Sequence, residues 1–197
     1  MWYGKAEVRT MRVSKAPEIR RQELLDTAMA VFAEKGYETT TMRDIARAAG
    51  VAAGLCYHYF QNKEMLYRQA VEQYAARCAA PFLAVFRQTD LPFRQAMARA
   101  EAAWQASMEH YPYYSYFHQA GNEMFHQQLN VYLIQALLPA LTDYLARRKE
   151  AGEIHIGAPQ AASLFLLHGQ LALAEAPDLT PEQRLQECKF LVEKLLQ

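Results

Sequence analysis

The fold is decided by residues 40–66, which read TTMRDIARAAGVAAGLCYHYFQNKEML. Gly50 separates two runs of small and apolar residues, each long enough for about two turns of helix. Thr41 carries the hydroxyl of a helix N-cap, and Asp44 stands three residues later, where a capping box places its acidic partner. The stretch therefore predicts two short helices joined by a tight turn, which is a helix-turn-helix.

The two short helices have surfaces that suit a close crossing. The residues that would face each other are small or apolar: Ile45, Ala46, Ala49, Val51 and Leu55. The second helix, predicted over Ala53–Tyr59, would then project outward. Because the major groove of DNA admits one α-helix, we expect this helix to read base edges while the first lies across the backbone. Asn62 is predicted to cap the next helix.

The remaining sequence also has helical periodicity. Apolar residues recur at spacings of three and four, and no alternating strand-like run has a useful length. We predict an all-α protein of about nine helices: the two short ones and 17–35, 63–87, 92–110, 112–121, 122–151, 159–175 and 181–196. Gly36 should end the first helix in a left-handed conformation. Pro81 should kink or split the helix that begins at residue 63.

Composition excludes several classes of protein. The chain has 197 residues with 21 basic and 21 acidic side chains, so its overall charge indicates no partner. Residues 1–70 carry a net charge of +3 and the rest −3, which gives weak support for a basic DNA-binding head. No apolar leader or membrane span is present, so we expect a cytoplasmic protein. Cys56, Cys78 and Cys188 are too widely spaced for zinc and are expected to be reduced thiols.

The chain carries no pattern typical of catalysis. A phosphate-binding glycine loop, a Gly-x-Ser-x-Gly elbow and a paired-histidine metal motif are all missing, so we expect neither an enzyme nor a cofactor. His118, Asn122, Glu123 and His126 would share one face of an unbroken helix and could then bind a divalent metal. Gly121 interrupts that face, and we therefore expect no metal site.

Residues 20–66 resemble the DNA-binding domain of the TetR family of transcriptional regulators. The same residue types fall at the same spacings, namely Phe32, Gly36, Tyr37, Thr41, Ile45, Ala46, Gly50, Val51, Tyr57, Phe60, Lys63, Glu64 and Leu66. The resemblance implies phosphate contacts by Thr41, Arg43, Tyr57, Tyr59 and Lys63. It also implies that four residues lie nearest the bases: Ala53, Gly54, Leu55 and His58.

Some of these residues have a second interpretation, and two positions depart from the family. Tyr57, Tyr59 and Phe60 would also suit an aromatic core under the second short helix, and Phe60 is left out of the site for that reason. Lys63 could instead be a solvated lysine at the start of a helix. Position 52 is Ala where the family often has Ser or Thr, so one capping or phosphate contact should be missing. Position 55 is Leu where a hydroxyl is common, which favours contact with a thymine methyl group.

We predict three parts: a flexible basic arm over 1–16, a DNA-binding domain over 17–62 and a helical regulatory and dimerisation domain over 63–197. The arm would place Lys5, Arg9, Arg12 and Lys15 in an adjacent minor groove. Alternatively it is a disordered tail, or Met11 is the true start of the protein. Resemblance to the family implies that the largest part senses a ligand and pairs two chains.

Two sets of residues are candidates for these tasks. Small and large apolar residues at helical spacing could form a four-helix dimer interface, or the chain's own core: Ala161, Phe165, Gly169, Ala172, Leu185, Cys188, Val192 and Leu195. Aromatic and polar residues could line an inducer pocket, or again a core: Trp104, Tyr111, Tyr114, Phe117, His118, Phe125 and Tyr132.

The interpretation that uses most of these features is a one-component transcriptional regulator. As a homodimer it would repress by binding a palindromic double-stranded DNA operator, and an unknown small-molecule effector would release it. The alternatives are a helical adaptor protein that has lost DNA binding, for which Ala52 is the hint, or an all-helical enzyme.

Overall fold

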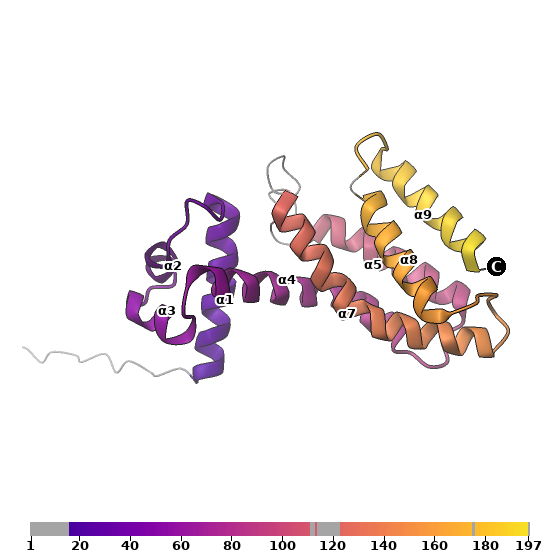
Figure 1. The fold of residues 1–197 in the computed structure, drawn as a ribbon, viewed down its shortest axis with the longest axis horizontal. Coiled ribbons are helices and arrows are strands. Elements are labelled where there is room, and N and C mark those ends of the chain that lie inside the picture. The colour runs from indigo at the N-terminus through magenta and orange to yellow at the C-terminus, as the bar shows by residue number, and fades with distance from the viewer. Residues whose placement is uncertain (1–15, 111–112, 114–122, 175, 197) are drawn as a thin grey trace, which may run out of the picture. The chain divides into compact units, whose positions relative to one another are not determined.

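The computed structural model describes residues 16–110, 113, 123–174 and 176–196, and all regular secondary structure in these ranges is α-helical (Figure 1). Eight helices are present in this part of the chain, which confirms the predicted all-α class. The helix predicted over 112–121 lies outside the described residues, as does the arm before residue 16. None of the described helices has both the length and the apolar character needed to cross a membrane.

The chain divides into two compact units between Leu66 and Tyr67. The first unit, here called the head, contains α1 (Pro17–Lys35), α2 (Met42–Ala48) and α3 (Ala53–Tyr59), and α4 (Lys63–Phe86) begins within it. The bounds of α1 and α3 are those predicted from the sequence. Gly36 ends α1 with a φ of 82°, as expected, and its N–H donates to the carbonyl of Phe32.

The head is organised around a small apolar core. One face of α1 is buried, including Leu24, Ala28 and Phe32, and the segments that follow α1 in the head also contribute buried side chains. These side chains are Ile45 of α2, Cys56 of α3, Phe60 and Leu66, all of them fully buried. Because both short helices bury only one side in this core, their other sides are left at the surface.

The second unit, here called the body, contains most of α4 and the helices α5 (Phe93–His110), α7 (Glu123–Glu150), α8 (Pro159–Ala174) and α9 (Pro181–Leu196). Its core gathers residues from all five helices, with Tyr144 and Leu145 of α7 fully buried. The Tyr144 hydroxyl donates to the carbonyl of Leu91 over 3.1 Å, so this buried polar group has a partner. Burial, the largest influence, raises the pKa of Tyr144 to about 12.

Pro81 does not split α4, which is one continuous helix from Lys63 to Phe86. Pro81 itself is exposed, whereas Ala79 before it and Val85 and Phe86 after it are buried in the body core. Packing on both sides of the proline therefore holds the helix together against the loss of one backbone hydrogen bond.

The start of α5 is tied to the end of α7 by one carboxylate. Glu153 accepts a hydrogen bond from the backbone N–H of Phe93 over 2.7 Å, and it forms an ion pair with Arg148 over 2.8 Å. Arg148 also donates to the carbonyl of Thr89 over 2.7 Å. Since the first N–H groups of a helix have no partner within it, Glu153 acts as a cap supplied from a distant part of the sequence.

Candidate nucleic-acid interface

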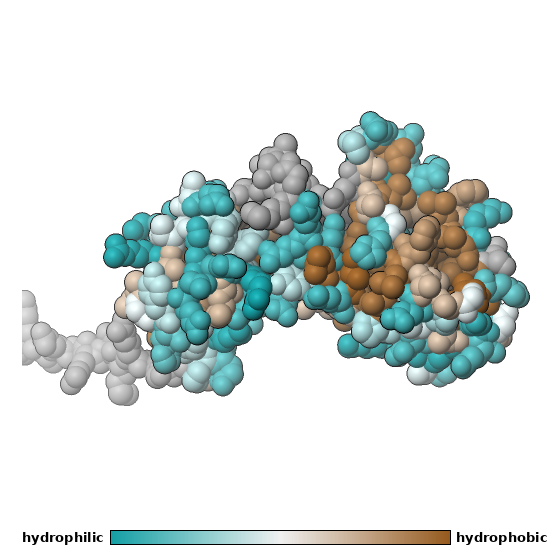
Figure 2. All heavy atoms as spheres, in the orientation of Figure 1, coloured by the Kyte–Doolittle hydropathy of each residue, from teal (hydrophilic) through white to brown (hydrophobic). Residues whose placement is uncertain are grey.

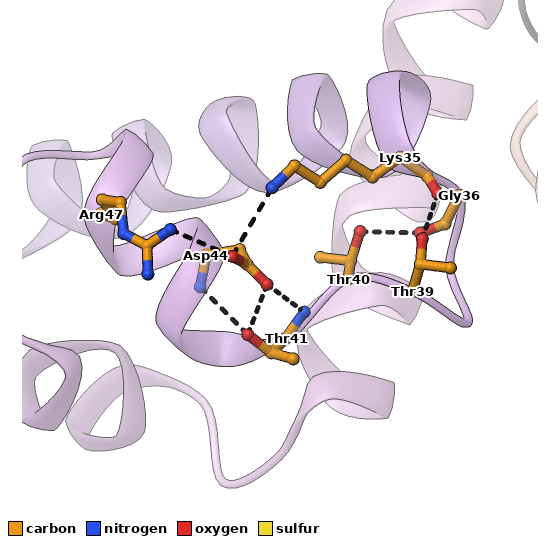
Figure 3. Close-up of polar contacts among 7 residues, drawn as sticks. All are labelled: Lys35, Gly36, Thr39, Thr40, Thr41, Asp44 and Arg47. Carbon is orange, nitrogen blue, oxygen red and sulfur yellow. Dashed lines mark hydrogen bonds and ion pairs between the residues drawn. The ribbon is translucent and has the colours of Figure 1, made fainter.

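The turn between α1 and α2 is fixed by hydroxyl groups (Figure 3). The Thr39 hydroxyl donates to the carbonyl of Lys35, and the Thr40 hydroxyl donates to the carbonyl of Gly36 over 2.7 Å. Thr40 is buried although it is polar. These bonds use carbonyls that the end of α1 leaves free, and they place Thr41 at the start of α2.

Thr41 and Asp44 form the capping box that the sequence predicted. The backbone N–H of Asp44 donates to the Thr41 hydroxyl over 3.2 Å, and the backbone N–H of Thr41 donates to the Asp44 carboxylate over 3.0 Å. The Thr41 hydroxyl donates its own proton to the same carboxylate over 2.5 Å. Two N–H groups at the start of α2 are thereby satisfied within the head.

Hydrogen bonds from Thr41, followed by the charge of Lys35, lower the pKa of Asp44 below its ordinary value of 3.8. Lys35 and Arg47 each approach the carboxylate to 3.5 Å. A lowered pKa means that the stabilisation by this carboxylate is complete above 3.8 and is lost only as the pH falls through the lower folded-state value. The cap is therefore intact at neutral pH.

Replacing Thr41 with alanine is expected to lower the free energy of unfolding by about 1 kcal/mol, because the hydroxyl of the N-cap is lost. The measurement is chemical denaturation followed by circular dichroism. Thr89→Ala is the matched control, since Thr89 is an exposed threonine in the turn after α4 and outside the box, and it should change stability by less than about 0.5 kcal/mol. Equal losses for the two variants would contradict the assigned cap.

Gly50 makes the turn between α2 and α3. Its φ is +65°, a conformation that costs L side chains energy, while a Cβ at this position would meet nothing within 4 Å. The backbone geometry, and not lack of space, therefore explains the glycine. The N–H of Val51 donates to the carbonyl of Ala46 over 3.0 Å and closes the turn. This arrangement completes the predicted helix-turn-helix.

One face of α3 is at the surface. Gly54, Tyr57 and His58 are exposed at spacings of three and four, and Tyr57 keeps 53% of its surface accessible. Cys56 lies on the opposite face and is fully buried, and burial raises the pKa of its thiol. The residues with intermediate burial are Ala53, Leu55 and Tyr59. Such a short helix with one side free is what a groove-reading element requires.

The start of α3 lacks a side-chain cap, as Ala52 predicted. Phe60, which follows α3, is fully buried, so its interpretation as a core residue is correct. The guanidinium of Arg21 lies 5.4 Å from the centroid of the Phe60 ring. Phe60 thus anchors the end of α3 to the head.

The cations of the interface differ in their surroundings. Arg43 and Arg47 are both exposed on α2 and stand four residues apart, so they lie on the same face of the helix. Sequence reasoning named Arg43 and missed Arg47, although their spacing of four was available as a signal. Lys63 is half-buried, and its ammonium group donates to backbone carbonyls of the head.

The structure places the other candidate residues as follows. In the ligand set, Phe125 is buried against Tyr74, and Trp104 and Tyr132 are half-buried; Tyr111, Tyr114, Phe117 and His118 lie outside the described residues. In the dimer set, Ala161, Phe165, Gly169, Ala172 and Leu195 are exposed, Leu185 and Cys188 are half-buried, and Val192 lies in the body core. No group of three metal-binding side chains occurs among the described residues.

The fold and this interface define a helix-turn-helix protein of the DNA-binding class. Residues 24–70 match the family model described as bacterial regulatory proteins, tetR family. Over these residues the chain is similar to the DNA-binding domain of the TetR family.

Two curated relatives are transcriptional repressors by name. The HTH-type transcriptional repressor KstR2 of Mycobacterium tuberculosis (strain ATCC 25618 / H37Rv) is 33% identical over 100 residues, which are 51% of this chain and 50% of the relative. KstR2 of Rhodococcus jostii (strain RHA1) is 55% identical over 47 residues, which are 24% of this chain and 23% of the relative. The chain therefore spans half or less of the length of these relatives.

The fold extends beyond the matched region. The crystal structure of a putative TetR-family transcriptional regulator from Mesorhizobium loti MAFF303099 has a TM-score of 0.67 at 17% identity and covers 92% of this chain and 97% of that one. At this identity the likeness shows the fold alone.

Proposed function

We propose that this chain is a one-component transcriptional repressor that binds a palindromic operator as a homodimer and is released by a small molecule. The observation that carries the proposal is the free face of α3, with Gly54, Tyr57 and His58 exposed above a buried Cys56. The match of residues 24–70 to the family model supports the same class, and the named relatives are repressors.

The contacts with DNA follow from the placement of the two short helices. The exposed face of α3 enters the major groove, with Gly54 allowing close approach and His58 near base edges. Arg43 and Arg47 of α2 have exposed cations and bind phosphates, while Tyr57 and Tyr59 carry hydroxyl groups that can donate to phosphate oxygens. The half-buried Leu55 contributes an apolar contact.

Pairing of two chains is supported by apolar surface on α8 and α9. Phe165 keeps 65% of its surface accessible, and Leu164, Phe190, Leu191 and Leu195 are also exposed. Figure 2 shows hydrophobic residues gathered over these two helices. We define the dimer seam by the exposed residues Ala161, Phe165, Gly169, Ala172, Phe190 and Leu195, without the buried Val192. Pairing would give two recognition helices for half-sites roughly 34–36 Å apart.

Release by a small molecule follows from this requirement for a fixed spacing. A ligand that favours another arrangement of the two recognition helices weakens binding, typically by about 5 to 150-fold. Trp104 and Tyr132 are half-buried aromatic residues of the body and are the described members of the proposed ligand set. The effector itself is left open.

His58→Ala and Arg43→Ala test the assigned contacts with a duplex selected from a random-sequence library by the wild-type chain. His58→Ala should relax selectivity at one base pair, whereas Arg43→Ala should weaken binding to all duplexes about equally. Each loss should be about tenfold in fluorescence anisotropy titrations.

Arg94→Ala is the matched control, because Arg94 is an exposed arginine of α5 in the body. Its affinity for the duplex should equal that of the wild type. If neither head variant differs from this control, the assignment of the interface to α2 and α3 is wrong. An adaptor protein or an enzyme would select no duplex at all.

A further inference from the structure

The ammonium group of Lys63 is held inside the head. Its Nζ donates to the carbonyl of Tyr37 over 2.8 Å and to the carbonyl of Glu38 over 3.3 Å. It also lies 4.3 Å from the centroid of the Tyr37 ring. A lysine has three N–H donors, and two backbone oxygens and one ring face account for its polar directions.

These bonds connect the first residue of α4 to the turn before α2. The carbonyl of Tyr37 also accepts from the backbone N–H of Thr40 over 3.3 Å. The Thr40 hydroxyl donates to the carbonyl of Gly36, and the next residue, Thr41, is the N-cap of α2. Lys63 therefore binds the carbonyls of Tyr37 and Glu38, while the Thr40 hydroxyl closes the same turn onto Gly36.

The surroundings of Lys63 do not favour a phosphate. Beyond burial, the charges of Glu64 and Glu38 raise the pKa of Tyr37, so both carboxylates act on the ring that Lys63 covers. A phosphate brought to Lys63 would meet these negative charges and would compete with two carbonyl oxygens already in place. Arg43 and Arg47, in contrast, are exposed on α2.

We propose that Lys63 is a positioning residue for DNA binding: it clamps the 37–40 turn so that α2 presents Arg43 to the DNA backbone, and it does not itself neutralise a phosphate. The inference rests on the proposed function. It replaces the phosphate contact that resemblance implies for this residue. Loss of the clamp should weaken binding through disorder in the turn, without changing the number of counterions released from DNA.

Salt dependence separates the two roles. Each protein–phosphate contact contributes about 0.9 to the slope of log affinity against log salt concentration. Lys63→Met keeps the length of the side chain and removes its charge. We expect about tenfold weaker binding of the selected duplex with an unchanged slope. The matched control is Arg43→Met, an exposed cation of the same head, for which the slope should fall by about 0.9.

Hydrogen exchange provides a second readout in the absence of DNA. The backbone amides of Thr40 and Thr41 donate within the clamped turn, to Tyr37 and to Asp44 respectively. In Lys63→Met these amides should exchange faster, while the amide of Leu145 in the body core should be unaffected. Lys63→Gln serves as the second variant if the methionine substitution impairs folding, which circular dichroism would show.

A positioning role and a phosphate contact for Lys63 therefore predict opposite results for the salt slope and for amide exchange. A slope reduced by about 0.9 with unchanged exchange at Thr40 and Thr41 would overturn the inference in favour of a phosphate contact. Unchanged affinity for DNA would overturn it in favour of a purely structural lysine. If the wild-type chain selects no duplex, the proposed function fails, and the inference fails with it.

Discussion

A chain carrying Phe165→Asp is expected to be monomeric at concentrations where the wild type is a dimer. Phe165 keeps 65% of its surface accessible on α8, and it is the most exposed large apolar side chain among the described residues. Aromatic residues at the centre of an interface typically contribute about 2 to 4 kcal/mol or more, and a buried unpaired carboxylate adds a further penalty. The dissociation constant of the dimer should rise by about 100-fold, as measured by sedimentation velocity over a concentration series.

Val131→Asp is the control for this experiment. Val131 is an apolar residue of α7 with 51% of its surface accessible, outside the seam. Its replacement should leave the dimer intact, which separates loss of the seam from a general effect of added charge. A Phe165→Asp chain that still pairs at the wild-type concentration would exclude α8 as the dimer seam. DNA binding by the monomeric variant should also weaken, because only one half-site is engaged at a time.

Replacing Phe60 with alanine is expected to lower the free energy of unfolding by about 3 to 5 kcal/mol. Phe60 is fully buried at the end of α3, and its removal leaves a cavity beneath the recognition helix. Denaturation followed by circular dichroism and by tyrosine fluorescence would measure the loss. Since the head and body are separate compact units, the unfolding curve of the variant should show the head melting first.

Tyr57→Ala is the matched control, because Tyr57 is an aromatic residue of the same helix that keeps 53% of its surface accessible. It should change stability by less than about 1 kcal/mol and should instead weaken DNA binding. The two aromatic residues, three apart in sequence, therefore have opposite expected effects. A loss below about 1 kcal/mol for Phe60→Ala would contradict its assignment to the core of the head.

The head could be predicted closely from its sequence, because local signals and tertiary packing agree there. Pro17 begins α1 and Gly36 ends it, and the structure has both. Thr41 and Asp44 stand at capping-box spacing, and the box is formed. The contacts of Lys63 could not be predicted in the same way. Its partners are the backbone carbonyls of Tyr37 and Glu38, and a backbone acceptor distant in sequence leaves no pattern of residue types.

The packing of the body was harder to predict from the sequence, because periodicity identifies an apolar face of a helix but does not specify which residues cover it. Val192 and Leu195 stand three apart on α9, yet Val192 is buried in the chain's own core and Leu195 is exposed. The two outcomes depend on how α9 is turned toward the rest of the body, which no local signal specifies. The same limit applies to Pro81, where packing of distant residues keeps α4 continuous.

We propose that the helix after Gly50 reads duplex DNA while two chains are paired. Selection from a random-sequence duplex library by the full wild-type chain, followed by sequencing of the retained fragments, tests it most directly. We predict a palindromic site with half-sites whose centres are separated by roughly 34–36 Å, or a multiple of one helical turn, bound by two or more chains. Recovery of sequences no different from the starting library would contradict the account.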